Sequence, residues 1–334
     1  MLTLMSGSGE RGVTSRRGFL RLAGGAAGAA VLAACGAPGG GERSEGTPEA
    51  ETRLIGVPPI DEREVVAVLE RPPRPEPAWA RGDRRQLERL ALPGTDWETP
   101  IYINRSGEPG PSVMVLGGVH GNEPGGWAAA ETIADWMPDR GLTVVIPRAN
   151  IVATEAFERT LPELGDLNRF YPGEPAESVN AFPMQWMAYS IIELAREFEV
   201  SLLLDLHESW GFFSERTQNG TAFLGQTVTN GASTEETGRI EAIALEVNEQ
   251  ITEREQLVIR DRFRNRFQRT TPNTNFDPSW PRGGTSSLGI GQFVPGLVPV
   301  LIEMGQQDQP EARRSELHQL IVRTSLRHEG MLTA

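Results

Sequence analysis

Residues 113–123 read Val-Met-Val-Leu-Gly-Gly-Val-His-Gly-Asn-Glu. A short apolar run bounded by glycines is typical of a strand buried on both faces of a sheet, so the sequence predicts a strand over Val113–Val119. His120 ends this run and Glu123 follows three residues later, a spacing at which a helical turn or tight loop can aim both side chains at one ion. The intervening glycines permit the sharp backbone path that this requires.

Two more predicted strands have a candidate metal ligand or a candidate proton acceptor at or near their end. Residues 201–206 lead into His207, and residues 298–304 contain Glu303. A further strand is predicted over residues 142–147, and apolar residues recur at helical spacing over residues 127–137, 184–198, 234–253 and 310–329. This alternation predicts an α/β fold with helices on both faces of the sheet. Because ligands bind at the carboxyl ends of strands in such sheets, we expect His120, His207 and Glu303 to meet at one edge.

Two imidazoles and one carboxylate are the ligand set of a catalytic zinc ion, whose fourth position is left to water. His120, Glu123 and His207 supply this set, so we predict one Zn²⁺ per chain and a zinc-dependent hydrolase. Glu303 is the candidate general base. Asp205, two residues before His207 on the same strand face, is expected to orient an imidazole, whereas Glu208 points the other way and is expected to be structural or to lie at the rim.

Residues 166–173 read Asp-Leu-Asn-Arg-Phe-Tyr-Pro-Gly. Asn168 and Arg169 can form charge-assisted hydrogen bonds to a substrate carboxylate, although an ordinary turn with a solvated arginine is the simpler interpretation of the pair alone. Arg159 or Arg148 could face the carbonyl oxygen under attack and stabilise its developing charge. Arg159 is the preferred catalytic candidate, because Arg148 lies at a strand end where a structural role is expected.

Three further features allow two interpretations each. Arginines recur every second residue from Arg260 to Arg266 and again at Arg269, which predicts a strand with a basic face that either meets solvent and surface acids or forms a rim for an anionic substrate. Trp210, Phe212 and Phe213 either line the substrate pocket or pack in the core. His318 and His328 are predicted to be surface residues of the last helix.

The composition excludes several classes of function. All 32 basic residues of the 334-residue chain are arginines, and the net charge is −13. Without lysine the chain can form neither a Schiff base with pyridoxal phosphate nor a P-loop, and an acidic balance disfavours a nucleic-acid partner. The sequence also lacks the Gly-x-Ser-x-Gly elbow of many serine hydrolases.

The first residues have the features of an export signal. Residues 15–21 read Ser-Arg-Arg-Gly-Phe-Leu-Arg and precede an Ala- and Gly-rich run that ends in Leu-Ala-Ala-Cys at Cys35. Twin arginines before a weakly apolar run are typical of twin-arginine export, and the run is too short for a stable membrane span. The Leu-Ala-Ala-Cys box resembles that of lipoproteins, which implies cleavage before Cys35, the single cysteine, and lipidation of its thiol. We therefore expect an exported protein anchored to the outer face of the cell membrane through Cys35, or a periplasmic one; the alternative is a disordered tail with a chance arginine pair.

The chain is predicted to divide into four parts. A signal peptide spans residues 1–34, and a Gly-, Pro-, Ser- and Glu-rich flexible tether spans residues 35–50. A Pro- and Arg-rich lead-in of irregular structure covers residues 51–97. The catalytic domain is expected over residues 98–334.

Five motifs in order resemble those of the succinylglutamate desuccinylase/aspartoacylase family, a branch of the zinc carboxypeptidase clan. They are Gly-Gly-Val-His-Gly-Asn-Glu-Pro, Pro-Arg-Ala-Asn, Asp-Leu-Asn-Arg-x-Tyr-Pro-Gly, Asp-Leu-His and Ile-Glu-Met-Gly, and they cover about residues 98–306. The resemblance implies a three-layer α/β/α sandwich with a mixed, mostly parallel sheet. It also implies roles for seven residues: His120, Glu123 and His207 as zinc ligands, Arg159, Asn168 and Arg169 as substrate-binding groups, and Glu303 as general base.

These observations predict an exported zinc amidohydrolase whose small-molecule or peptide substrate carries a free carboxylate. Deacylation of N-acyl amino acids and carboxypeptidase action both fit. No tyrosine follows Tyr189, so the late tyrosine by which carboxypeptidases contact their substrate has no counterpart. The alternative from another class is a lipoprotein binding module that kept the fold and lost catalysis.

Overall fold

The computed structural model describes residues 83–177, 182–216, 221–230, 234–261 and 286–333. The predicted signal peptide, the tether and most of the lead-in lie outside these residues. The strands are β1 (Arg85–Ala91), β2 (Thr99–Arg105), β3 (Ser112–Leu116), β4 (Leu142–Ile146), β5 (Leu202–Ser209), β6 (Thr227–Asn230), β7 (Val258–Asp261) and β8 (Val298–Gly305). The α-helices are α2 (Pro124–Ile133), α3 (Ile151–Ala156), α4 (Pro183–Glu197), α5 (Thr234–Asn248) and α7 (Glu311–His328).

All eight strands belong to one mixed sheet in the order β1-β2-β4-β3-β5-β8-β6-β7. Four of the seven strand pairings are parallel, and these include the central β4-β3-β5-β8 group. The sheet is antiparallel where β1 joins β2, where β2 joins β4 and where β6 joins β8. The central strands are apolar on both faces, as a parallel arrangement covered by helices requires.

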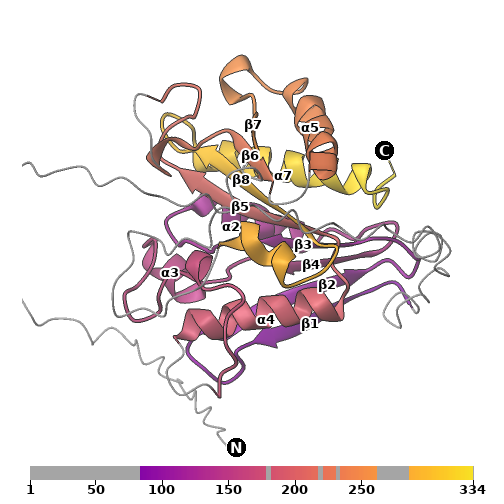
Figure 1. The fold of residues 1–334 in the computed structure, drawn as a ribbon, viewed down its shortest axis with the longest axis vertical. Coiled ribbons are helices and arrows are strands. Elements are labelled where there is room, and N and C mark those ends of the chain that lie inside the picture. Colours follow the sequence, from indigo (N-terminus) through magenta and orange to yellow (C-terminus); the bar gives the residue numbers. More distant parts are fainter. Residues whose placement is uncertain (1–82, 178–181, 217–220, 231–233, 262–285, 334) are drawn as a thin grey trace, which may run out of the picture. The chain divides into compact units, whose positions relative to one another are not determined.

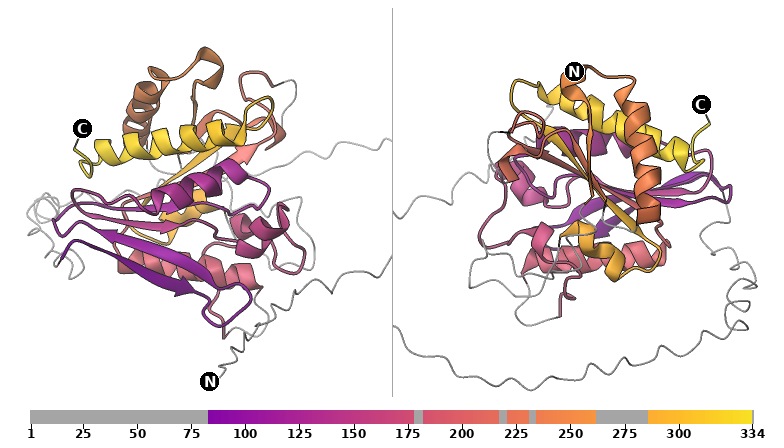
Figure 2. Two further views of the ribbon diagram at one scale, coloured as in Figure 1. Left: turned by 180° about the vertical axis from the view of Figure 1, so that it is seen from behind. Right: turned by 45° about the horizontal axis from the view of Figure 1, so that its top comes forward.

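Helices cover both faces of this sheet (Figures 1 and 2), so the predicted three-layer α/β/α architecture is confirmed. On one face α4 packs in a core that includes Met114, Leu116 and Ile146. On the other face α2, α5 and α7 share a second core with Val113 and Val115 of β3, the strand that also carries Met114 and Leu116. Alternate residues of each central strand therefore point into different cores.

The same alternation decides where the polar residues of β5 and β8 point. Leu202, Leu204 and Leu206 of β5 face the core of α2, α5 and α7, and so do Val298, Val300, Ile302 and Met304 of β8. The residues between them, which include Asp205, His207 and Glu303, must point to the α4 side. A regular strand pattern thus delivers three polar side chains to one face of the sheet.

Some predicted boundaries were wrong. The sheet begins with β1, ahead of the expected start of the catalytic unit near Glu98, because a mostly exposed edge strand that mixes charged and apolar residues lacks the apolar run by which strands were recognised. Helix α2 begins at Pro124 and ends at Ile133 rather than spanning residues 127–137, since proline is favoured in the first helical turn. Helix α5 ends at Asn248, five residues before the predicted end. Among the described residues, no helix has the length and apolar character needed to cross a lipid bilayer.

Candidate metal centre and catalytic site

The loop between β3 and α2 carries two of the predicted ligands. Its path is fixed by the neighbouring loop after β4, because Gly117 N–H donates to the carbonyl of Ile146 and Ala149 N–H donates to the carbonyl of Gly117. Gly121 lies so close to α3 that a Cβ atom there would come within 1.9 Å of the carbonyl oxygen of Ala153, so only glycine fits. Glu123 occupies the N-cap position of α2, and its side chain turns back toward His120 instead of bonding to the helix.

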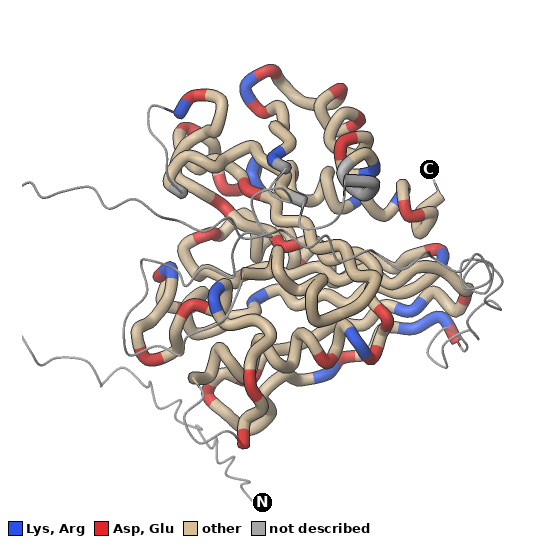
Figure 3. Tube along the Cα trace, in the orientation of Figure 1, with Lys and Arg blue, Asp and Glu red and all other residues tan. Residues whose placement is uncertain are grey.

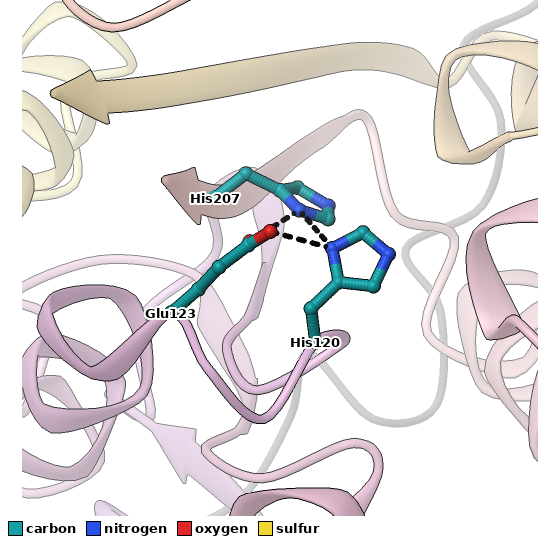
Figure 4. A group of neighbouring side chains, drawn as sticks. All are labelled: His120, Glu123 and His207. Atoms are coloured by element: carbon teal, nitrogen blue, oxygen red, sulfur yellow. Dashed lines mark hydrogen bonds and ion pairs between the residues drawn. The ribbon is translucent and has the colours of Figure 1, made fainter. Parts of the chain in front are cut away.

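His120, Glu123 and His207 converge on one point (Figure 4). Glu123 Oε1 lies 2.8 Å from His120 Nδ1, and Glu123 Oε2 lies 2.8 Å from His207 Nδ1. The two Nδ1 atoms are 3.1 Å apart. All three residues are at most 4% exposed, so the group is shielded from bulk water.

Each imidazole has a second carboxylate partner on its far side. His120 Nε2 lies 3.2 Å from Asp166 Oδ1, and His207 Nε2 lies 2.9 Å from Asp205 Oδ2. An Nε2–H group that donates to each aspartate fixes the tautomer and leaves the Nδ1 lone pair free to face the centre. The orienting role expected for Asp205 thus has the required contact.

The donor set fits a metal ion. With both protons on Nε2, two nitrogen lone pairs and a carboxylate face one point, an arrangement that a bound cation would stabilise. Nitrogen and oxygen ligands at zinc distances in tetrahedral geometry lie about 3.3 Å from one another. The 2.8–3.1 Å separations between the donor atoms of the three residues are close to that value.

The charges of the site shift its pKa values strongly. Burial raises the pKa of Glu123, but His120 and His207 lower it more, and the pKa lies well below its usual value. Burial lowers the pKa of His207, but Asp205 and Glu123 raise it more, and the pKa lies well above its usual value. The pocket therefore holds Glu123 ionised, the form that binds a metal ion, and a metal ion bound to His207 Nδ1 would displace the proton that the raised pKa keeps on this imidazole.

Glu303 lies beside this centre without joining it. It is the register partner of His207 in the parallel pair β5–β8 and of Thr227 in the antiparallel pair β6–β8. Burial raises the pKa of Glu303 to about 7, against the opposing effect of His207. Its Oε2 atom is buried and has no hydrogen-bond partner among the described residues. A carboxylate with a free oxygen and a near-neutral pKa is suited to accept a proton.

The predicted substrate-binding residues occupy a loop beside the metal centre. Arg159 Nη1 lies 3.0 Å from Glu123 Oε1, and the Arg159 side chain remains 49% exposed. Asn168 is buried and its Oδ1 accepts from Ser287 N–H at 2.9 Å. Arg169 Nη1 donates to the carbonyl of Asn168 at 2.6 Å. Arg148 instead pairs with Glu131 and stacks on Trp127, in keeping with the structural role expected for it.

Asp166 is the site residue that the sequence interpretation missed. It begins the Asp-Leu-Asn-Arg motif, and its Oδ1 contacts His120 Nε2 and also accepts from Asn168 N–H at 2.9 Å. Asp166 therefore connects the metal centre to the Asn168–Arg169 loop. The signal available in the sequence was an acidic residue two positions before Asn168, but nothing in its spacing linked it to His120.

The two histidines of α7, both predicted to be surface residues, differ in their burial. His318 is fully buried, not a surface residue, because it lies on the face of α7 that packs on the sheet, and its pKa falls to about 3 through burial. His328 is exposed as expected and pairs with Glu246.

Among the aromatic residues that follow β5, Phe212 is buried, whereas Trp210 is 58% exposed.

The basic stretch lies mostly outside the described residues. Its first residues belong to β7, where Arg260 lies over the ring of Phe213, and Arg216 stacks on the same ring at 4.0 Å. Nearby, Arg254 pairs with Glu215 at 2.8 Å. Figure 3 shows acidic positions next to basic ones in the segments around β6 and β7.

The fold is that of carboxypeptidase-like α/β proteins, and it carries a candidate metal centre at one edge of the central strands. The model of the succinylglutamate desuccinylase/aspartoacylase catalytic domain matches residues 109–210. Residues 109–210 are thus similar to the catalytic domain of this family, as the motifs predicted. The match includes the three candidate metal ligands, while Glu303 lies beyond it.

Solved structures support the fold. An aspartoacylase family protein from Mesorhizobium loti is 18% identical with a TM-score of 0.53, and the match covers 77% of this chain and 70% of that one. A succinylglutamate desuccinylase/aspartoacylase from Rhodobacter sphaeroides is 19% identical with a TM-score of 0.52, covering 77% of this chain and 68% of that one. No curated protein matches the chain significantly.

A third similar structure is the cell shape determinant Csd4 from Helicobacter pylori, a D,L-carboxypeptidase solved with mDAP bound. It is 18% identical with a TM-score of 0.52, and the match covers 66% of this chain. This chain spans about half the length of the Csd4 chains it matches, 51% in this case.

Proposed function

We propose that this protein is a zinc-dependent hydrolase of amide bonds whose substrate carries a free carboxylate. The observation that carries the proposal is the convergence of the donor atoms of His120, Glu123 and His207, with the carboxyl of Glu303 one strand away. Zinc bound there would supply a water molecule of lowered pKa and polarise the carbonyl of the substrate. The family match to amide hydrolases supports the same reaction class.

Glu303 is the proton carrier in this proposal. Its carboxylate accepts a proton from the attacking water and returns it to the leaving amine, which balances the hydrolysis of the amide. In the metal-free site burial raises the pKa of Glu303 to about 7, and a bound cation would lower it, so that the carboxylate is ionised and ready to accept the proton. His120 and His207 are held in place by Asp166 and Asp205, so they do not need to move during the reaction.

Recognition of the substrate is assigned to the loop that follows α3. The side-chain oxygen of Asn168 accepts a hydrogen bond from Ser287 N–H, so the side-chain N–H groups of Asn168 remain for a substrate carboxylate. Arg169 lies next to it with the fork geometry that suits a carboxylate. Arg159, half-exposed beside Glu123, is placed to stabilise the oxygen of the carbonyl under attack.

Two substrate types fit this arrangement. The family supports an N-acyl amino acid, and the lack of a tyrosine after Tyr189 also favours deacylation over standard carboxypeptidase action. The similarity to Csd4 and the predicted export support peptides, including cell-wall fragments. A panel of N-acyl amino acids and C-terminal dipeptides, assayed with zinc-loaded protein, would distinguish the two.

The free carboxylate provides the decisive experiment. Masking it as a methyl ester or amide removes the charge that Arg169 is proposed to bind. A charge-assisted hydrogen bond contributes about 1.5–3 kcal/mol, so kcat/KM should fall roughly 10- to 150-fold. Arg169→Ala should lower activity on the free acid and abolish the difference between free and masked substrates. Equal rates for both forms with the unmodified enzyme would reject the carboxylate site while leaving the reaction class open.

We further propose that the protein acts outside the cytoplasm as a lipoprotein attached through Cys35, on the strength of the twin arginines at residues 16 and 17 and the Leu-Ala-Ala-Cys box. A binding module that kept the fold but lost catalysis is the competing proposal. The complete set of His120, Glu123, His207 and Glu303 favours the enzyme. Absence of hydrolysis across the whole panel by protein that holds zinc would favour the module.

A further inference from the structure

Glu208 occupies an unusual position next to the metal centre. It follows His207 on β5, and its backbone N–H donates to Glu123 Oε2 at 3.0 Å. Glu123 Oε2 therefore has a fixed donor beside its contact with His207 Nδ1. The Glu208 side chain points to the opposite face of the sheet, away from the candidate ligands.

On that opposite face the Glu208 carboxylate is buried and fully paired. Its Oε1 accepts from Arg314 Nε of α7 at 2.6 Å, and its Oε2 accepts from Gln306 Nε2 at 3.1 Å. The Glu208 side chain is 0% exposed and the Arg314 side chain 9%. Arg314 also donates through Nη1 to the carbonyl of Gln309. A buried ion pair of this quality is costly to disrupt, because removal of one partner leaves an uncompensated charge.

Gln306 links this ion pair to the metal loop. The same Nε2 group that donates to Glu208 donates to the carbonyl of Asn122 at 2.9 Å. Asn122 immediately precedes Glu123. The carboxylate of Glu208 and the backbone that carries Glu123 are thus joined through one side chain.

The start of α2 rests directly on the same pair. A Cβ atom at Gly125 would lie 2.2 Å from Glu208 Oε1 and 2.7 Å from Arg314 Cβ. A glycine is therefore required for the helix that Glu123 caps to approach this closely. The position of α2, and with it the direction of the Glu123 side chain, depends on where Glu208 and Arg314 lie.

We propose that Glu208, Arg314 and Gln306 form a positioning brace that holds Glu123 in the geometry needed to bind the metal ion. The brace acts at two points, through Glu208 N–H on the carboxylate of Glu123 and through Gln306 on the backbone of Asn122. None of its side chains touches the reacting centre. This inference rests on the proposed zinc site and extends it to residues on the far face of the sheet.

The test is the zinc affinity of Glu208→Gln and Gln306→Leu, measured by competition with a chromophoric chelator. Glu208→Gln keeps the shape but removes the charge that Arg314 pairs with. Gln306→Leu keeps most of the volume, removes the link to Asn122, and leaves the ion pair intact. Changes around metal ligands typically cost about 10- to 100-fold in affinity, and we expect a loss in that range for both variants. Arg313→Gln is the matched control, because it removes a partly exposed arginine of the same helix that pairs with Glu255 and Glu316, and its zinc affinity should be unchanged.

A second readout separates positioning from stability. The cobalt-substituted variants should show a changed visible absorption band, because the band reports the geometry of the ligands. Lower melting temperatures of zinc-depleted variants with unchanged zinc dissociation constants would overturn the proposal and make the brace purely structural. If Glu208→Gln does not fold, Gln306→Leu decides the matter alone. An unmodified protein that binds no zinc would refute the proposed function itself, an outcome distinct from normal affinity in the variants.

Discussion

His207 and Glu303 are direct register partners on the parallel strands β5 and β8. Neighbouring strands lie about 4.8 Å apart, so the hydrogen bonds of the sheet fix the separation between a candidate metal ligand and the candidate base. Both side chains point to the α4 face because both positions alternate with residues of the other core. Both residues are thus held by hydrogen-bonded strands of the sheet rather than by loops.

The first prediction concerns metal content. The unmodified protein should bind one zinc ion per chain, and His207→Ala should lose most of it, since removal of one of the ligands weakens the site greatly. Elemental analysis after dialysis measures this directly. His328→Ala, which changes an exposed histidine paired with Glu246, serves as the control and should keep full occupancy. Full zinc occupancy in His207→Ala would contradict the assignment of His207 as a zinc ligand.

Glu303→Gln should retain zinc and substrate affinity but lose turnover. The amide matches the carboxylate in shape, yet it cannot accept a proton. General-base action contributes about 10²–10⁴ in rate, so kcat should fall by that factor. Steady-state kinetics alongside a zinc assay tests this. A near-normal kcat would show that another group is the base.

Glu303 should also make stability depend on pH. Its pKa is raised from 4.5 to about 7 in the folded protein, so the folded state holds its proton where the unfolded state has lost it. The resulting penalty is absent below pH 4.5, grows as pH rises toward 7 and is constant above it. Relative to Glu303→Gln, the unmodified protein should therefore lose on the order of 3 kcal/mol of unfolding free energy between acidic and mildly alkaline pH.

Urea unfolding of both proteins at pH 5 and pH 8, with a chelator present, measures this difference. The chelator is needed because a bound cation would itself lower the pKa of Glu303. An equal stability gap at both pH values would mean that Glu303 titrates near its ordinary value in the folded protein.

Asp205→Asn should weaken zinc binding without removing a ligand. Asp205 Oδ2 faces His207 Nε2 at 2.9 Å, and an amide in its place can present its N–H₂ group and favour the wrong tautomer of the imidazole. We expect about a 10- to 100-fold loss of zinc affinity. Asp139→Asn changes an exposed carboxylate that accepts a hydrogen bond from Thr333. This variant is a suitable comparison and should bind zinc normally. Unchanged affinity in Asp205→Asn would remove the orienting role.

Cys35→Ser should leave export intact while releasing the protein from the membrane fraction, because the thiol is the proposed site of lipid attachment. Lysine at both Arg16 and Arg17 should instead block export. Fractionation of cells that express each variant, followed by immunoblotting, distinguishes these effects. Persistence of Cys35→Ser in the membrane would point to a different anchor.

The central elements could be predicted from the sequence because their patterns are strong. The apolar runs before His120 and around Glu303 mark strands buried on both faces, and the polar residue at or near the end of each run marks the candidate site. The family motifs added the mixed sheet, which periodicity alone does not specify. Edge strand β1 was missed because its exposed residues carry no such pattern.

The site contacts that depend on distant parts of the chain could not be predicted. Asp166 lies 46 residues from His120, and Arg314 lies 106 residues from Glu208. Nothing in the spacing of these residues indicates that they meet. The burial of His318 likewise could not be predicted from the sequence, since a polar residue in an amphipathic helix is ordinarily assigned to the solvent face of the helix.

The placement of Asn168 and Arg169 on a loop, with His207 and Glu303 on strands, has a consequence for how this protein could diversify. Under the proposed function, substitutions in this segment would change the substrate preference, while the strands would keep His207 and Glu303 in place. Asp166 sets the limit of that freedom, since it belongs to the loop and also contacts His120. A descendant with a new preference should therefore vary around Asp166 yet keep the aspartate itself.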